Sequence, residues 1–201
     1  MLSRNEKKVI LQLASRHGRK KSPYFISEGL RCCFEALRLR PTWIKAAYCD
    51  SSFLEHNDYK ELVALLNVED LSLKQLADSE FAELAQTENP QGLLFLLERP
   101  AESELFLPRP FCLILDQLRE PGNLGTILRS CWAAGLKSLW LTKGCTDVYA
   151  AKVIRAGMGA QFALDIQILP SIQEAIANFK ELNGGDIWTT MPEAECSIFS
   201  D

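Results

Sequence analysis

Residues 115–135, LDQLREPGNLGTILRSCWAAG, join the end of an apolar strand to an amphipathic helix through a Pro-Gly turn. Asn123 is predicted to be the N-cap of this helix, and Gly135 has the residue type that commonly ends one. Arg129 falls outside the apolar stripe of the helix, so its guanidinium is free to project toward a groove. At about 100° per residue, that stripe is formed by Leu124, Ile127, Leu128, Cys131 and Trp132.

The rest of the second half alternates in the same way between strand and helix patterns. After the apolar strand at 111–116 and the helix at 123–135, the predicted elements are a strand at 138–142, a helix at 149–157, a strand at 162–169, a helix at 171–182 and a strand at 186–190. Strands separated by helices predict a parallel sheet that is covered on both faces. Such a sheet binds ligands beyond the carboxyl ends of its strands.

The first hundred residues form a smaller alternating α/β unit. The predicted elements are helices at 28–38 and 58–66, strands at 43–48, 68–71 and 92–98, and helical turns at 72–85. Residues 99–110, RPAESELFLPRP, contain three prolines and no sustained periodicity, which is typical of a linker. We therefore predict domains at 1–100 and 111–201, joined by a linker at 101–110.

Composition narrows the class of protein. The chain has 201 residues, 47% of them hydrophobic and 24% charged, which indicates a globular protein. No apolar run is long enough for a bilayer span, and the N-terminus lacks the apolar core of a signal peptide, so we expect no membrane and a cytoplasmic location. Seven scattered cysteines without a Cys-x-x-Cys pair, and only two histidines, argue against disulfides, a metal site and a Ser-His-Asp triad.

Basic residues are concentrated at the N-terminus. Residues 1–40 hold ten lysines and arginines against three acids, a net +7 in a chain of net charge −4, which leaves −11 for the remainder. This basic arm, which includes Arg19, Lys20 and Lys21, predicts a surface that contacts the phosphates of a nucleic acid. The same charges are also compatible with an ordinary solvated helix face and a basic loop.

A helix that starts at a strand end, with an arginine on its open side, favours an anionic ligand such as a phosphate or a ribose phosphate. Gly125 in its first turn would let a backbone or a ligand come close. The pattern lacks both the dinucleotide fingerprint G-x-G-x-x-G and a P-loop lysine. The spacing is equally compatible with Arg129 as a plain surface residue and Asn123 as a plain cap.

Three segments resemble one family, the SpoU (TrmH-like) RNA ribose 2′-O-methyltransferases. EPGNLGTILRSCWAAG resembles the family's first motif, and KVIRAGMGAQF is similar to a later one. In the first half, YFISEGLRCCFEAL and TENPQGLLFLL resemble the ends of a ribosomal-protein-like substrate-binding domain that accompanies many of these enzymes. The positions that match are Glu120, Pro121, Asn123, Gly125 and Arg129 in the first motif, and Arg155, Gly157, Gly159 and Ala160 in the later one.

The resemblance implies a second domain of the SPOUT (trefoil-knot) class and transfer of a methyl group from S-adenosylmethionine to a ribose 2′-hydroxyl of RNA, ribosomal rather than transfer RNA. Arg129 would orient the phosphate and stabilise charge, because a guanidinium with a pKa above about 12 is a poor base. Asn123 would hold the motif loop, with Glu120, Pro121 and Gly125 shaping it. Arg155 would contact RNA, and so would Arg19, Lys20 and Lys21 of the basic arm. Arg155 and its glycines could also serve only to shape a helix-to-strand connection.

The family's other two motifs, which thread the knot, bind the cofactor and form much of the homodimer interface, have no counterpart before Asp201. We therefore expect a chain truncated before the knot, with its cofactor-binding residues beyond Asp201. We expect these 201 residues alone to be inactive and to bind S-adenosylmethionine poorly. The alternatives are a non-catalytic RNA-binding or ribosome-assembly factor that retains the fold, and an α/β enzyme for a small phosphorylated substrate.

Overall fold

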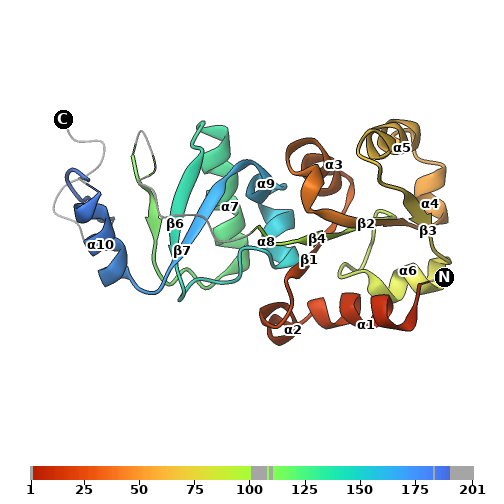
Figure 1. The fold of residues 1–201 in the computed structure, drawn as a ribbon, viewed down its shortest axis with the longest axis horizontal. Coiled ribbons are helices and arrows are strands. Elements are labelled where there is room, and N and C mark those ends of the chain that lie inside the picture. Colours follow the sequence, from red (N-terminus) through yellow and green to blue (C-terminus); the bar gives the residue numbers. More distant parts are fainter. Residues whose placement is uncertain (1, 101–107, 109–110, 183, 191–201) are drawn as a thin grey trace.

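The computed structural model describes residues 2–100, 108, 111–182 and 184–190, and it contains one β-sheet in each half of the chain (Figure 1). The predicted linker at 101–110 lies outside these residues except for Pro108, and so do the last eleven residues of the sequence.

The first sheet has four strands in the order β1-β4-β2-β3. β4 (Leu93–Glu98) runs antiparallel to both of its neighbours, β1 (Tyr24–Glu28) and β2 (Ile44–Cys49). β3 (Leu73–Gln75) adds to β2 in parallel. Successive residues of β4 enter two different hydrophobic clusters, which shows that both faces of this sheet are covered.

Helices cover the two faces of the first sheet. α1 (Arg4–Leu13) and α6 (Asp78–Leu84) pack on one face, where their apolar side chains join those of β4. α3 (Leu30–Leu39) and α5 (Tyr59–Val68) pack on the other. The shorter helical segments are α2 (Arg16–Lys20), the 3-10 turn η1 (Pro41–Trp43) and α4 (Ser51–Leu54).

The predicted strand at 68–71 is wrong. Val68 is the last residue of α5 and is 77% exposed, so it has no sheet face to bury. Leu71 N–H donates to Leu66 O at the end of the helix, and Asp70 has a φ of 54°. The strand forms later, as β3, and only α6 is helical in the region predicted as helical turns.

The second sheet is parallel throughout, in the order β5-β6-β7, which confirms the predicted fold class. Its strands are β5 (Ile114–Leu115), β6 (Ser138–Thr142) and β7 (Asp165–Leu169). The helices α7 (Pro121–Ala133), α8 (Ala151–Ala156) and α9 (Ala160–Ala163) lie on the side toward the first domain, and α10 (Ile172–Glu181) lies on the opposite side (Figure 1). Every residue of the central strand β6 is buried.

Two strand predictions in this half need correction. Residues 162–169 do not form one strand, because α9 takes up Ala160–Ala163 and β7 starts only at Asp165. Residues 186–190 are not a strand either, and Trp188 within them is 88% exposed. An apolar run alone did not distinguish a buried helix turn from a strand at Phe162.

One hydrophobic core continues from the first domain into the second. Its centre is an aromatic group in which the ring of Phe25 in β1 lies 4.6 Å from that of Tyr149 and 6.3 Å from that of Phe162. Trp43 contacts the same two rings at 6.4 and 6.3 Å. The aromatic group therefore fixes α9 and the turn before α8 against β1 and η1.

Among the helices described, none combines the length and the apolar character that crossing a bilayer requires.

Candidate functional site

The first turn of α7 follows the carboxyl end of β5, as predicted, but it starts earlier than the sequence pattern indicated. The N-cap is Glu120, whose Oε1 accepts a hydrogen bond from Gly122 N–H at 3.2 Å, so the predicted cap at Asn123 is wrong. Pro121 explains the shift, because a residue without an N–H and with a fixed φ suits the first helical position. Lys152 Nζ lies 3.6 Å from the same carboxylate oxygen of Glu120 and links the start of α7 to α8.

Arg129 is exposed on the outer side of α7, and no residue in the described part of the chain pairs with its guanidinium. The predicted apolar stripe is confirmed: Leu124, Leu128 and Cys131 are buried, and Ile127 and Trp132 pack against the same core. Asn123 is also exposed and makes no hydrogen bond to a described side chain. The two polar side chains lie about 9 Å apart along the helix axis.

Gly125 is the point at which α7 and α8 touch. A Cβ at this position would lie 2.5 Å from Ala156 Cβ, 2.7 Å from Val153 O and 2.8 Å from Gly157 N. The close approach predicted for Gly125 is therefore confirmed, with a neighbouring backbone as the partner. This contact also sets the position of Arg155, which precedes Ala156 on α8.

Arg155 lies at the junction between the two domains. It is half-buried and lines a cavity of about 350 Å³ together with Met158 from its own domain and residues of the first domain such as Arg31 and Gln91. Its Nη1 atom is shielded from solvent and has no hydrogen-bond partner among the described residues. Sequence reasoning singled out Arg155 but did not find this cavity, because its wall comes from three separate segments of the chain, at 28–32, 87–91 and 155–158.

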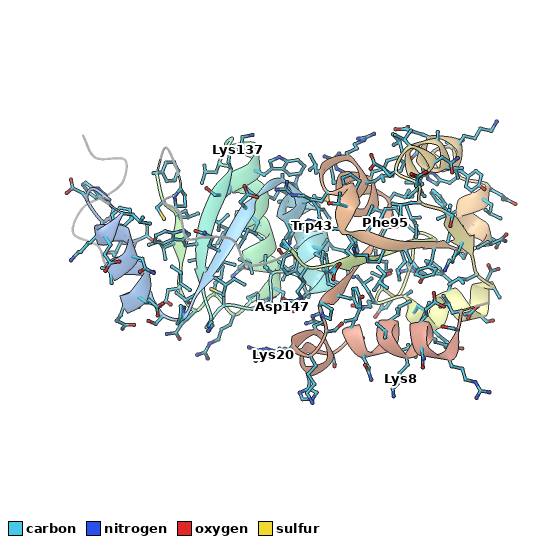
Figure 2. The ribbon with its side chains drawn as sticks, viewed as in Figure 1. Lys8, Lys20, Trp43, Phe95, Lys137 and Asp147 are labelled. Atoms are coloured by element: carbon cyan, nitrogen blue, oxygen red, sulfur yellow. The ribbon has the colours of Figure 1, made fainter. Side chains whose placement is uncertain are left out.

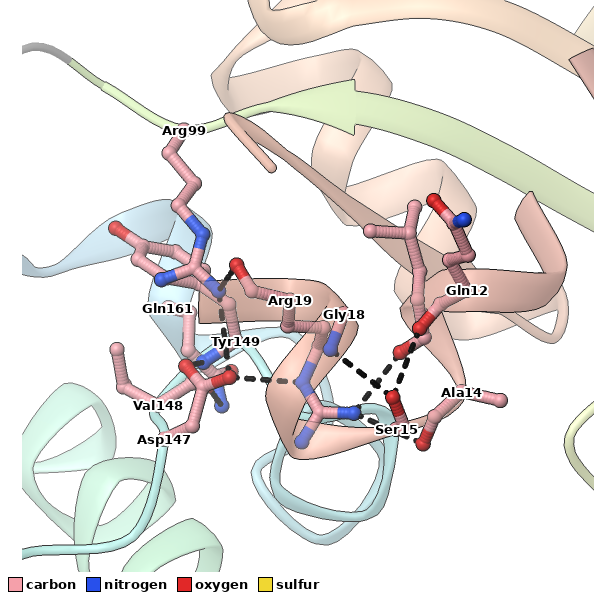
Figure 3. Close-up of polar contacts among 11 residues, drawn as sticks. Gln12, Ala14, Ser15, Gly18, Arg19, Arg99, Asp147, Val148, Tyr149 and Gln161 are labelled. Atoms are coloured by element: carbon pink, nitrogen blue, oxygen red, sulfur yellow. Dashed lines mark hydrogen bonds and ion pairs between the residues drawn. The ribbon is translucent and has the colours of Figure 1, made fainter. Parts of the chain in front are cut away.

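Arg19 was predicted as an RNA contact, but its guanidinium is used inside the protein. Nε donates to Asp147 Oδ2 at 2.8 Å, and Nη1 donates to the carbonyl oxygens of Leu13 and Ala14 at the end of α1 (Figure 3). Arg99 Nη2 reaches the same Asp147 oxygen at 3.3 Å. Arg19 is 9% exposed, so it joins α1 to the second domain and does not belong to an open basic surface.

Lys20 and Lys21, in contrast, are exposed, and no described carboxylate pairs with either. Lys8 on α1 and Lys20 on α2 lie on the same side of the molecule and point away from it (Figure 2). Between residues 4 and 20 the basic arm is thus helical, in α1 and α2, and most of the charge there faces solvent. Of the three residues predicted here as RNA contacts, the two lysines keep the required exposure.

A network that sequence reasoning missed joins the carboxyl ends of β5 and β6. Thr142 Oγ1 donates to Asp116 Oδ1 at 2.7 Å and accepts from Gln117 N–H at 3.2 Å. Cys145 Sγ contacts Leu115 O at 3.2 Å, and Gln117 adopts a φ of 50°. The sequence signal for this network was that Asp116 and Thr142 each stand at the end of a predicted strand.

S-adenosylmethionine would bind to a sheet of this class at that edge. The polar groups described there bond to one another, so the described residues do not by themselves make up a site for the cofactor. Among the same residues there is no cluster of three histidine, cysteine or acidic side chains able to hold a metal ion. Burial raises the pKa of the Cys32 thiol to about 11 even though Arg155 and Arg31 act to lower it, so Cys32 is not a ready nucleophile.

Both halves of the chain match known protein families. Residues 110–199 match the SpoU rRNA Methylase family, and residues 5–94 match the MRM3-like substrate binding domain. The mouse protein named rRNA methyltransferase 3, mitochondrial, is 33% identical over 165 residues, which are 79% of this chain and 38% of that protein. A Bacillus subtilis 23S rRNA (guanosine-2′-O)-methyltransferase is 33% identical over 91 residues, 45% of this chain and 36% of that one.

Solved structures agree with these matches. An RNA 2′-O ribose methyltransferase is 28% identical, with a TM-score of 0.70 over 90% of this chain and 68% of that one. An rRNA methyltransferase from Sinorhizobium meliloti, solved with AdoMet bound, has a TM-score of 0.73 at 24% identity over 90% of this chain and 67% of that one, which shows the shared fold. The chain spans 38% of the length of the mouse relative.

Proposed function

Because the chain belongs to the SpoU rRNA methylase family, we propose that the protein methylates a ribose 2′-hydroxyl in structured ribosomal RNA with S-adenosylmethionine as methyl donor. The observation that carries this proposal is Arg129, an exposed arginine without a described partner on the helix that holds the family's first motif. The match of residues 110–199 to the SpoU rRNA Methylase family and the similarity to the mouse rRNA methyltransferase 3 support ribosomal over transfer RNA as substrate.

Arg129 acts on the phosphate and on developing charge. A guanidinium offers a planar fork of donors to a phosphate, and its fixed positive charge stabilises an oxyanion that forms at the 2′-oxygen. Asn123, exposed in the first turn of the same helix, has a free amide with which to orient RNA. Glu120, Pro121 and Gly125 shape the helix start, through its cap, its first residue and its contact with α8. S-adenosylmethionine supplies the methyl group when bound.

The proposal is tested with the variant Arg129→Ala, made in the complete gene product. We expect methyl transfer to rRNA to fall by about 100-fold or more, since removal of one charge-stabilising donor costs that much. RNA affinity should fall by no more than about tenfold, the loss of one phosphate contact, because the stabilisation of the 2′-oxyanion is made only in the transition state. Labelled methyl incorporation and RNA binding are measured side by side.

Arg38→Ala serves as the control, since Arg38 is an exposed arginine on α3 of the first domain, where it pairs with Glu61. It should leave both quantities unchanged. Full methyl transfer by the Arg129→Ala protein would rule out the assigned role.

The alternative is a non-catalytic RNA-binding or ribosome-assembly factor. It is favoured by the mutual hydrogen bonding of Asp116 and Thr142 at the sheet edge where a cofactor would bind. A binding factor would show no methyl incorporation in the wild type, and Arg129→Ala would change only its RNA affinity.

Lys20 and Lys21 complete the proposed RNA surface, since both are exposed and unpaired among the described residues. A homodimer and a cytoplasmic location are further parts of the proposal. Exposed apolar side chains such as Ile168 support the first, and sedimentation tests it. The described cysteines are all free thiols, which supports a reducing compartment.

A further inference from the structure

The cavity at the domain junction is built from both domains. Gly29, Arg31 and Gln91 contribute from the first, and Arg155 and Met158 from the second. Its volume of about 350 Å³ is at the small end of ligand sites. A molecule bound there would contact both domains at once.

Arg155 differs from the other arginines that lie at this junction. Arg19 and Arg99 share Asp147, and Arg40 Nη2 lies 2.8 Å from Asp165 Oδ1. No described residue forms an ion pair or a hydrogen bond with the guanidinium of Arg155. A half-buried charge without a partner lowers the stability of the protein, so its presence on a cavity wall indicates an anionic ligand.

A second guanidinium reaches the same cavity from the first domain. Arg31 is mostly exposed and forms an ion pair with Glu35 at 3.0 Å, which leaves other donors of its fork free. Both arginines act electrostatically on the buried thiol of Cys32, between α3 and α8. The positive end of α3, a helix of ten residues, lies at the same wall and adds to the potential.

The carboxylate of Glu28, which lines the cavity, already accepts hydrogen bonds from within the protein. Glu28 is buried, and its carboxylate accepts from Gln86 N–H at 2.7 Å and from the Thr87 hydroxyl. It therefore holds the segment that leads to Gln91. Gln91 Oε1 accepts from Leu30 N–H at 3.0 Å, which leaves the amide NH₂ of Gln91 as a further donor at the cavity.

We propose that this cavity binds one phosphodiester of the RNA substrate, with the Arg155 guanidinium and the Arg31 guanidinium as its donors from the two domains. The inference rests on the proposed function, in that it assigns the anion to RNA. It goes further by giving Arg155 a defined ligand and by making RNA a bridge between the substrate-binding and the SpoU domains. A free phosphate or a nucleoside monophosphate has the same chemistry and is a separate arm of the test.

The experiment measures binding of a structured rRNA fragment to Arg155→Met as a function of salt. Loss of one phosphate contact should weaken binding by about tenfold and reduce the slope of log K against log salt by about 1. The melting temperature should stay the same or rise, because the substitution removes an unpaired charge from a half-buried position. Lys60→Met, which removes an exposed charge on α5, is the control and should change none of the three.

Arg155→Lys should recover the salt slope but not the full affinity, because it keeps the charge without the fork. Unchanged RNA affinity and slope in Arg155→Met would overturn the proposal. So would a lower melting temperature, which would assign Arg155 a structural role. A site for free phosphate is indicated instead if inorganic phosphate or adenosine monophosphate at millimolar concentration protects the wild type against heat and the RNA does not.

These outcomes are independent of the methylation assay. RNA binding that weakens in Arg155→Met while the wild type transfers no methyl group would retain the phosphodiester site and reject the enzyme. Normal methylation together with unchanged RNA binding in Arg155→Met would reject the phosphodiester site and retain the enzyme.

Discussion

Single residues decide how the motif helix is placed. Glycine at position 125 allows α7 to contact α8 backbone to backbone, and this contact positions Arg155 relative to the motif that carries Arg129. The resemblance assigns both arginines to RNA. Helical spacing predicted the exposure of Arg129, but it did not predict that Arg155 lies at the domain junction. Arg19 illustrates the limit, since a basic residue in a basic segment turned inward to Asp147.

Gly125→Ala is expected to destabilise the protein. The added Cβ would come within 2.8 Å of Ala156, Val153 and Gly157 in α8, so the two helices must separate. Overpacking of this kind costs about 1–3 kcal/mol in the free energy of unfolding, and urea denaturation measures it.

Ser130→Ala on the exposed side of the same helix is the control, and it should change the unfolding free energy by less than about 0.5 kcal/mol. Equal stabilities of the two variants would contradict the tight contact.

At the scale of elements, the residues at the ends of helices and strands determine where each element begins and ends. α1 begins with a capping box, in which Ser3 Oγ accepts from Glu6 N–H at 3.2 Å and Glu6 Oε2 accepts from Ser3 N–H at 3.0 Å. α7 begins with Glu120 as its cap and Pro121 as its first residue. The capping box of α1 and the Ser15 cap of α2 make this part of the N-terminal arm a pair of helices and not an unstructured basic tail.

Ser3→Ala should fray α1 and raise the pKa of Glu6 only in part, because it removes the hydroxyl but keeps the backbone N–H that donates to Glu6 Oε2. The hydrogen bonds from Ser3, backbone first, hold the pKa of this carboxyl below its ordinary value. The stabilisation it gives is therefore present above about pH 4.3, the unfolded pKa, and is lost as pH falls through the lower folded pKa.

NMR titration of Glu6 and hydrogen exchange in α1 measure the two effects, with a loss of about 1 kcal/mol expected for the helix. A Glu6 pKa that does not rise at all in the variant would show that the Ser3 hydroxyl has no part in lowering it.

For the whole molecule, the arrangement of the two domains matters most. The aromatic group of Phe25, Trp43, Tyr149 and Phe162 gives them a common core. Beside it, Asp147 accepts from Arg19 and Arg99 across the same junction (Figure 3). We expect a single cooperative unfolding transition, since neither domain can lose its core alone.

Asp147→Ala should lower the free energy of unfolding by about 3 kcal/mol, because it leaves two largely buried guanidinium groups without their carboxylate. Calorimetry should show a lower melting temperature, and RNA affinity should fall as the cavity between the domains loosens.

Glu61→Gln breaks the exposed pair with Arg38 and provides the comparison, with an expected change below about 1 kcal/mol. If the two variants lose equal stability, the junction network contributes no more than a surface pair.

The sequence by itself determined the α/β class, the parallel second sheet, the buried stripe of α7 and the motif residues around Arg129, because these follow from local periodicity and residue type. Only the tertiary structure decided that Arg19 turns inward, that Phe162 belongs to a helix in the shared core, and that Arg155 faces a cavity with Arg31. These are long-range outcomes: each depends on which distant side chain supplies a carboxylate, a ring or an empty space, and no local pattern encodes that.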